Sequence, residues 1–284
     1  MTETSVNGEV EVGAAEWVNF DLQIADQVAR ILIRRPAEEV AKGRRADPHW
    51  ELFEILNRLR VDNSVRVVVI SGVRDGEFWV PMPPSGDGGA GHLRQDSKRL
   101  WKASTAIVRL HQTMAELDRP IVAKVNGDAL ALGSSIMFAC DLIVAREDAR
   151  IADTHLGMGE VDPYRGSMTM GVLPGDGGAS LLPLVMSPYK AKEYLMLARE
   201  YTGADLAQLG IINAAVSAED LDDEVERLVA ALLRRPAFAL AWTKRVANKH
   251  VVDQLNHTLD PAIAYELVNM YEVMVQGEQS FDLE

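Results

Sequence analysis

Short apolar runs recur along the first two thirds of the chain and alternate with segments of helical spacing. Residues 19–35 alternate apolar and polar side chains, which predicts a strand, a turn and a second strand. Residues 65–72, 120–127 and 141–148 are mostly β-branched or aliphatic, typical of strands buried on both faces. Residues 48–60 space their apolar side chains as a helix does. The pattern predicts βαβ units and an α/β domain.

The strand signal fades after about residue 185, where helical spacing takes over. Four helices are predicted there, at residues 187–201, 217–235, 236–255 and 262–274. Leu221, Val225, Leu228 and Leu232 fall on one face of the second of these helices. We therefore expect three parts: a flexible N-terminus at 1–18, an α/β core at 19–210 and a helical C-terminal region at 211–284.

One stretch, residues 77–92, breaks this rhythm. Its first half holds three prolines and its second half is rich in glycine, so we expect a long irregular loop. The glycine clusters GDGGAGH and PGDGGAS lack the lysine and hydroxyl residue of a nucleotide-binding loop. The second cluster could still begin a helix whose backbone amides face a ligand.

Composition narrows the possible functions. The formal net charge of −13 and the absence of a basic stripe argue against a nucleic-acid partner. A single cysteine excludes an internal disulfide, and no cysteine–histidine cluster suggests a metal site. No apolar run is long enough to span a membrane, and the N-terminal residues do not have the pattern of a signal peptide. We therefore expect a cytoplasmic protein without a metal or a bound cofactor.

The richest candidate chemistry lies in residues 154–178. His155 can accept a proton near neutral pH, and a carboxylate beside it would hold its tautomer and stabilise the imidazolium. Asp153 and Asp162 are nearest in sequence, whereas Asp176 becomes the partner only if the intervening loop folds back. From residue types alone, an ordinary loop histidine is an equally good interpretation.

Residues 118–148, DRPIVAKVNGDALALGSSIMFACDLIVARED, resemble the crotonase superfamily, the enoyl-CoA hydratase/isomerase fold. The segments LPGDGGASLLPLVM and AKEYLMLAREYTGADLAQLGIINAAVS match the pattern of that family as well, and the resemblance covers roughly residues 19–260. It implies a crotonase-like spiral of βαβ units with a helical C-terminal trimerisation region. It also implies a homotrimer or hexamer.

The resemblance implies an oxyanion hole, in which two backbone amides stabilise an enolate. By position these amides belong to Met82 and Leu132. Met82 stands between two prolines, which have no N–H, so a slip of one residue would remove that donor. Ordinary enoyl-CoA hydratases carry a glutamate where this chain has Ser135 and a second one where it has His155. Two-glutamate hydration is therefore not expected.

A smaller branch, 6-oxocamphor hydrolase and related β-diketone hydrolases, resembles the chain more closely. Its histidine and its Pro-Gly-Asp-Gly aspartate fall on His155 and Asp176, if residues 160–171 are an insertion. A second active-site histidine falls on His49, and a C-terminal glutamate falls on Glu266. The third histidine of that branch is replaced here by Leu132.

Three functions remain open at this point. In the first, Asp176 orients His155, which deprotonates water for carbon–carbon cleavage of a 1,3-dicarbonyl substrate, and His49 or Glu266 returns a proton to carbon. In the second, the substrate is an unsaturated acyl-CoA, and coenzyme A would be present only as part of this substrate. His155 or Glu160 would then replace the glutamates, and the phosphates would contact Lys244, Arg245 and Lys249. In the third, the fold is a catalytically silent scaffold.

Overall fold

Two β-sheets form the centre of the computed structural model, which describes residues 17–34, 46–80, 97–156 and 171–271. The main sheet has the strand order β1-β2-β3-β5-β7-β10. Its strands are β1 (Phe20–Ala25), β2 (Val28–Ile33), β3 (Val67–Gly72), β5 (Ile121–Val125), β7 (Leu142–Arg146) and β10 (Ala214–Val216). The second sheet consists of β4 (Gly76–Trp79), β6 (Gly127–Leu130), β8 (Arg150–Ala152) and β9 (Tyr201–Thr202).

The chain alternates between the two sheets as it advances. β3, β5 and β7 are parallel neighbours in the main sheet, and each is followed directly by β4, β6 or β8 in the second sheet. Each repeat therefore adds one strand to both sheets, which produces the expected spiral. β1 and β2 form an antiparallel hairpin whose turn residues, Asp26 and Gln27, have positive φ angles. The strand–turn–strand prediction for residues 19–35 is confirmed.

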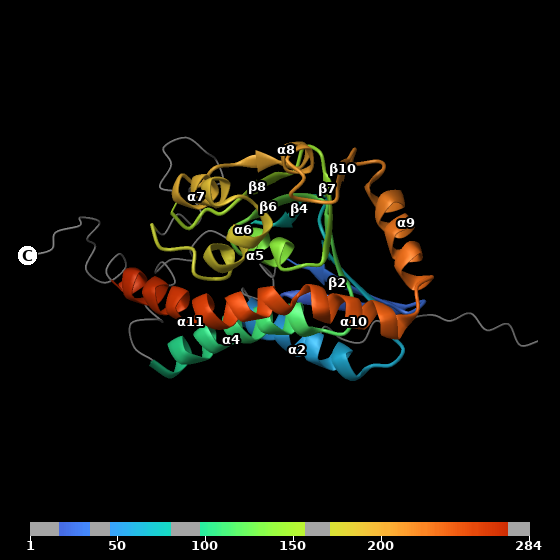
Figure 1. The fold of residues 1–284 in the computed structure, drawn as a ribbon, viewed down its shortest axis with the longest axis horizontal. Coiled ribbons are helices and arrows are strands. Elements are labelled where there is room, and N and C mark those ends of the chain that lie inside the picture. The colour runs from blue at the N-terminus through green and yellow to red at the C-terminus, as the bar shows by residue number, and fades with distance from the viewer. Residues whose placement is uncertain (1–16, 35–45, 81–96, 157–170, 272–284) are drawn as a thin grey trace, which may run out of the picture.

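Helices cover the sheets on several sides (Figure 1). They are α2 (Pro48–Val61), α4 (Ser97–Glu116), α5 (Leu132–Phe138), α6 (Gly178–Val185), α7 (Pro188–Met196), α8 (Gly203–Gln208), α9 (Leu221–Leu233), α10 (Ala237–Ala247) and α11 (Lys249–Tyr271). The long helix α11 packs against both α4 and α6, so the C-terminal part of the chain lies beside the core helices. None of the helices in the described part of the chain is long and apolar enough to cross a membrane.

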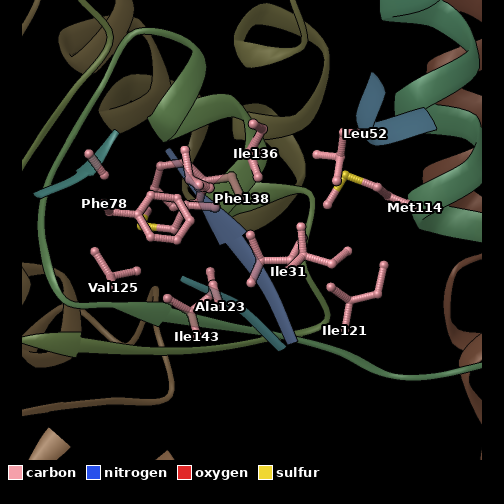
Figure 2. Packing of buried hydrophobic residues seen from close by; sticks show 14 of the residues in the cluster. Ile31, Leu52, Phe78, Met114, Ile121, Ala123, Val125, Ile136, Phe138 and Ile143 are labelled. Carbon is pink, nitrogen blue, oxygen red and sulfur yellow. The ribbon is translucent and has the colours of Figure 1, made fainter. Parts of the chain in front are cut away.

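The main sheet is buried on both faces, as its continuous apolar runs predict. On one face, side chains of β2, β4, α2, α4 and α5 form a single cluster that includes Ile31, Phe78, Leu52, Met114 and Phe138 (Figure 2). On the other face, valines of β2, β3, β5 and β7 pack against the apolar stripe of α9. Alternate residues of one strand therefore serve two separate cores.

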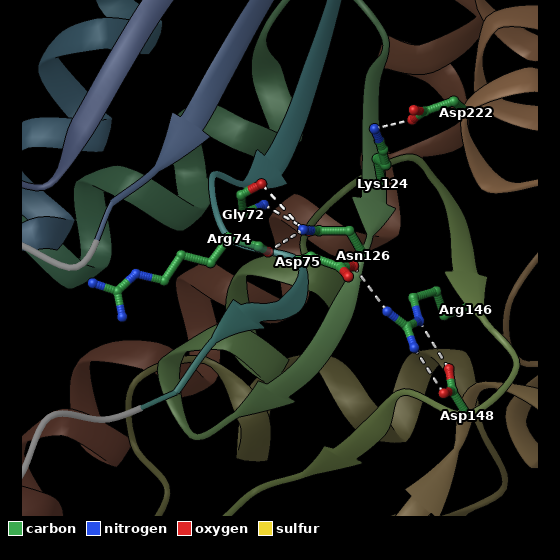
Figure 3. Close-up of polar contacts among 8 residues, drawn as sticks. All are labelled: Gly72, Arg74, Asp75, Lys124, Asn126, Arg146, Asp148 and Asp222. Atoms are coloured by element: carbon green, nitrogen blue, oxygen red, sulfur yellow. Dashed lines mark hydrogen bonds and ion pairs between the residues drawn. The ribbon is translucent and has the colours of Figure 1, made fainter. Parts of the chain in front are cut away.

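Asn126 links the two sheets at the point where the chain leaves β5. Its side-chain amide donates to the carbonyls of Gly72 and Arg74, at 3.1 and 2.6 Å, and its oxygen accepts from the Gly72 N–H at 2.8 Å (Figure 3). The next residue, Gly127, lies so close to β4 that a Cβ there would be 1.8 Å from the carbonyl carbon of Gly76. The Asn-Gly pair therefore fixes how the two sheets approach each other.

Some elements differ from the sequence predictions. Residues 77–79, expected in an irregular loop, belong to β4, and residues 81–92 of that loop lie outside the described residues. The segment 236–255 forms two helices separated at Asn248, and α11 continues through the predicted last helix as far as Tyr271. β10 adds a strand to the main sheet from the region predicted to be helical.

The Gly127→Ala variant tests the close approach of the sheets. We expect the free energy of unfolding to fall by about 3 kcal/mol or more, because backbone atoms of β4 cannot move away as a flexible side chain would. Gly210→Ala is the comparison, since Gly210 has a positive φ but open space around it, and should cost about 1 kcal/mol. Urea unfolding measures both, and equal losses would contradict the steric explanation.

Candidate active site

His155 lies in the loop after β8, where Asp153 holds its ring. The Nδ1–H group donates to Asp153 Oδ1 at 2.7 Å, and the backbone N–H of His155 donates to the same oxygen at 3.1 Å. Both side chains are buried. Asp153, which is only two residues away, therefore fixes both the orientation of the ring and the nitrogen that faces the rest of the site.

Asp176 lies on the opposite side of the imidazole. Its Oδ2 is 3.7 Å from His155 Nε2, and its Oδ1 accepts a hydrogen bond of 2.8 Å from the Ser135 hydroxyl. Asp176 therefore lies close to His155, as its expected involvement required. Asp153, which the sequence analysis also considered as a partner, is the residue that bonds Nδ1, while Asp176 faces Nε2. The structure places the imidazole between two carboxylates.

This arrangement decides the charge of the imidazole. Burial alone would lower the pKa of His155, but the carboxylates of Asp176 and Asp153 outweigh it and raise the pKa to about 10. Burial alone would raise the pKa of Asp176, but His155 and His49 outweigh it and lower that pKa. At neutral pH His155 is therefore an imidazolium and Asp176 is ionised. His155 cannot accept a proton from water until it has lost its own.

Glu266 reaches the same site from α11. It is 7% exposed, and burial raises the pKa of its carboxyl to about 7, with His155 opposing the shift and Asp176 reinforcing it. Its Oε2 is buried and has no hydrogen-bond partner within the described parts of the chain. Glu266 is thus a carboxyl group that can both take up and release a proton near neutral pH.

His49 is the second residue of α2 and completes the group of side chains that the sequence analysis named as catalytic candidates. Asp47 caps the helix, and its Oδ1 lies 3.1 Å from His49 Nδ1. Burial alone would lower the pKa of His49, but Asp47 outweighs it, with smaller contributions from Asp176 and Glu266, so the pKa is raised. His49 Nε2 is buried without a partner among the residues that the structure describes.

The Pro-Gly-Asp-Gly-Gly turn before α6 brings these groups together, because its glycines leave room for Glu266, for Asp153 and for a further histidine, His111. A Cβ on Gly175 would lie 2.5 Å from Glu266 Oε2, and one on Gly178 would lie 2.5 Å from Asp153 Oδ2. A Cβ on Gly177 would lie 2.1 Å from Nε2 of His111. The glycine cluster clears space for side chains of the protein itself.

His111 is a buried residue of α4 to which the sequence analysis assigned no role. The helical spacing did carry a signal, since position 111 is four residues after Ile107 and four before Ala115, on the side of α4 that packs against the core. A histidine on such a face is unusual enough to single out. Only the folded chain shows that it reaches Gly177.

The structure describes one half of the expected oxyanion hole. Leu132 is the first residue of α5, so its N–H has no acceptor within the helix. It follows Ala131, whose φ of 49° turns the chain sharply into the helix. A Cβ on Gly133 would lie 2.6 Å from Trp79 Cβ, so the helix begins in close contact with β4. Met82 lies outside the described residues, as does Glu160.

A metal ion is a further possibility for such a group. Within the described ranges, Asp153, His155 and Asp176 offer three ligand atoms that lie within 4.8 Å of one another. Asp153 Oδ1 already accepts from Nδ1 and Asp176 Oδ2 faces Nε2, so the pairing of these groups with one another accounts for their closeness without a metal. The sequence-based expectation of no metal stays a prediction.

Replacing Glu266 with glutamine tests the raised pKa. A carboxyl whose pKa rises on folding stabilises the protein fully below its unfolded pKa, and this contribution is lost as pH increases through about 7. Between pH ~4.5 and ~8.5 the variant should therefore gain up to about 3 kcal/mol of unfolding free energy relative to the natural chain. Urea unfolding across this pH range measures the gain. The exposed Glu219→Gln is the control, and a pH-independent difference for Glu266→Gln would refute the assignment.

Comparison with known proteins agrees with this architecture. A model of the enoyl-CoA hydratase/isomerase family matches residues 23–280. Crotonyl-CoA hydratase of Syntrophomonas wolfei is 23% identical over 86% of each chain. An enoyl-CoA hydratase/isomerase structure from Mycobacterium paratuberculosis has 25% identity and a TM-score of 0.77, covering 93% of this chain and 100% of its own. A β-diketone hydrolase structure from the cyanobacterium Anabaena shares the fold, with 19% identity, a TM-score of 0.74 and coverage of 91% and 96%. The chain therefore belongs to the enoyl-CoA hydratase/isomerase family, the crotonase superfamily of enzymes.

Proposed function

We propose that this chain hydrolyses a carbon–carbon bond of a 1,3-dicarbonyl compound. The observation that carries the proposal is the buried row Asp153–His155–Asp176 with a proton-exchanging carboxyl, Glu266, beside it. Ser135 occupies the position at which ordinary hydratases, by resemblance, carry a glutamate, and it donates a hydrogen bond to Asp176. A serine hydroxyl cannot replace a carboxylate base, so the chemistry centres on the other groups.

Glu266 is the group best suited to activate water. General acid–base catalysis is most efficient when the pKa of the catalytic group lies near the working pH. His155, with a pKa of about 10, is cationic at neutral pH, whereas Glu266, with a pKa of about 7, is partly ionised. This reverses the expectation from sequence, in which His155 was the base. His155 and His49 instead oppose the rise in the pKa of Glu266 and so keep part of it ionised.

In the proposed reaction, Glu266 takes one proton from water and returns it to the product, so the carboxyl ends in its starting state. Glu266 removes a proton from water, whose oxygen attacks one carbonyl carbon and places negative charge on the carbonyl oxygen. The tetrahedral intermediate then collapses, the carbon–carbon bond breaks, and its electron pair forms the enolate of the second carbonyl. The Leu132 N–H, together with Met82 as the expected second donor, stabilises the oxygen charge. Glu266 finally donates its proton to the enolate carbon.

The related structures support the choice of fold rather than of reaction. The Anabaena protein, a β-diketone hydrolase bound to (S)-3-oxocyclohexyl acetic acid, has the same fold, so this architecture can accommodate such a ligand. At 19% identity the likeness extends no further than the fold. The residue pattern of this chain is what favours the hydrolase branch.

A pH profile of kcat/KM with a panel of cyclic 1,3-diketones tests the proposal. We expect kcat/KM to rise with pH through about 7, because ionised Glu266 is the base. Glu266→Gln should lower kcat by about a hundredfold or more, while the exposed Glu219→Gln leaves it unchanged. A rise centred near 10 would instead make His155 the base. The absence of any diketone turnover would refute hydrolysis.

The second candidate is hydration or isomerisation of an unsaturated acyl-CoA, which the sequence similarity to a crotonyl-CoA hydratase favours. The expected phosphate contacts need revision. Lys244 is buried and forms an ion pair with Asp141 at 2.6 Å, so it is not available to coenzyme A. Arg245 and Lys249 are more exposed, although each has an acidic neighbour.

Calorimetry with crotonyl-CoA separates the two functions. The hydrolase proposal predicts no heat of binding at micromolar ligand. Binding in the micromolar range followed by hydration would favour the acyl-CoA function instead. A protein that neither binds crotonyl-CoA nor cleaves diketones would fit the scaffold interpretation.

A further inference from the structure

His111 is a histidine in a position where an aliphatic residue would be expected. It is 1% exposed on α4. Its Nδ1 lies 3.0 Å from the carbonyl oxygen of Ile107, which can only accept, so Nδ1 carries the proton. Burial lowers the pKa of His111, with the Ile107 carbonyl and Asp176 opposing the shift, so the ring is neutral. Nε2 is therefore a bare acceptor.

That acceptor has no hydrogen-bond partner in the described parts of the molecule. Leaving a buried polar atom unpaired destabilises the folded state, and such atoms in natural proteins call for an explanation. His111 is also one of the residues that line a cavity of about 440 Å³. The position of the ring therefore depends on the contact of Nδ1 with Ile107 and on the contact of Nε2 with Gly177.

The tip touches the turn that carries Asp176. Nε2 lies 2.1 Å from the place where a Cβ of Gly177 would be, and Gly177 has a φ of 122°. Asp176 precedes Gly177 directly, and its two oxygens contact Ser135 and His155. A shift of the ring would move the turn, and with it the carboxylate that lies opposite His155.

We propose that His111 is a positioning residue: its imidazole seats the Gly177 turn and so holds Asp176 in place against His155 and Ser135. The catalytic consequence rests on the proposed function, but the positioning itself does not. The unpaired acceptor fits this role, because proteins retain destabilising polar groups where function requires a particular shape or charge. A leucine would suit the apolar surroundings better and would not reach Gly177 in the same way.

The test compares His111→Leu with the natural chain by histidine ¹⁵N NMR. His155, whose pKa is about 10, should titrate about one unit lower or more in the variant, because Asp176 is no longer held close. The melting temperature should stay unchanged or increase, since the unpaired acceptor is gone. His111→Gln, which keeps a polar tip of similar reach, should restore part of the shift and guards against a loss of folding.

His257→Leu is the matched control. His257 also directs Nδ1 at a carbonyl four residues earlier, that of Asp253 at 2.5 Å, but it is exposed on α11. It should alter neither His155 nor turnover. With a 1,3-diketone substrate, His111→Leu should lower kcat about tenfold with KM within about twofold. An unchanged His155 titration in a folded His111→Leu variant would overturn the proposal, whether or not diketones are substrates.

Discussion

The structure depends on compensation of charge among buried side chains. An unpaired buried carboxylate or imidazolium costs several kcal/mol, and removing one member of a buried pair leaves the other uncompensated. Here Asp153 and Asp176 face the two nitrogens of His155, and Ser135 supplies a further hydrogen bond to Asp176. The imidazole of His155 attracts the carboxylates on both sides of it, and the surrounding elements must keep their positions for that to hold.

The spiral fold supplies these positions from distant parts of the chain. Ser135 comes from α5, Asp176 from the turn before α6, His155 from the loop after β8, and Glu266 from α11. The helix α11 lies against α4 and α6, which brings Glu266 next to the glycine-rich turn (Figure 1). The turn accepts this crowding only because its glycines have no side chains. The packing of the C-terminal helix and the assembly of the site therefore depend on each other.

The same compensation separates the pKa values of the site. The imidazole between two carboxylates holds its proton more firmly, with a pKa of about 10, while the carboxyl of Glu266, with less compensation, titrates at about 7. Both pKa values lie above their ordinary values, and the imidazole keeps the higher of the two. Membership of the family establishes the fold, whereas the reaction has to be argued from the residues of the site, because one fold can host many chemistries.

The sequence by itself determined the elements with a strong period and the family. Strands β3, β5 and β7 were predicted because both of their faces are buried, and α9 because its apolar stripe faces the sheet. The short strands of the second sheet were not predicted, since two to four residues carry no period. His155, Asp176, His49 and Glu266 were singled out by resemblance, and the fold brings them near one another, although their roles stay proposals.

The tertiary structure alone decided which partner each group has. Asp153 rather than Asp176 holds Nδ1 of His155, and the Ser135 hydroxyl bonds to Asp176 across forty-one positions of the chain. His111, to which the sequence analysis assigned no role, reaches Gly177 from α4. Spacing along a chain fixes which face a residue occupies within its own element. The depth of burial and the distance to the next charge, which set the proton affinities, arise only when separate elements pack together.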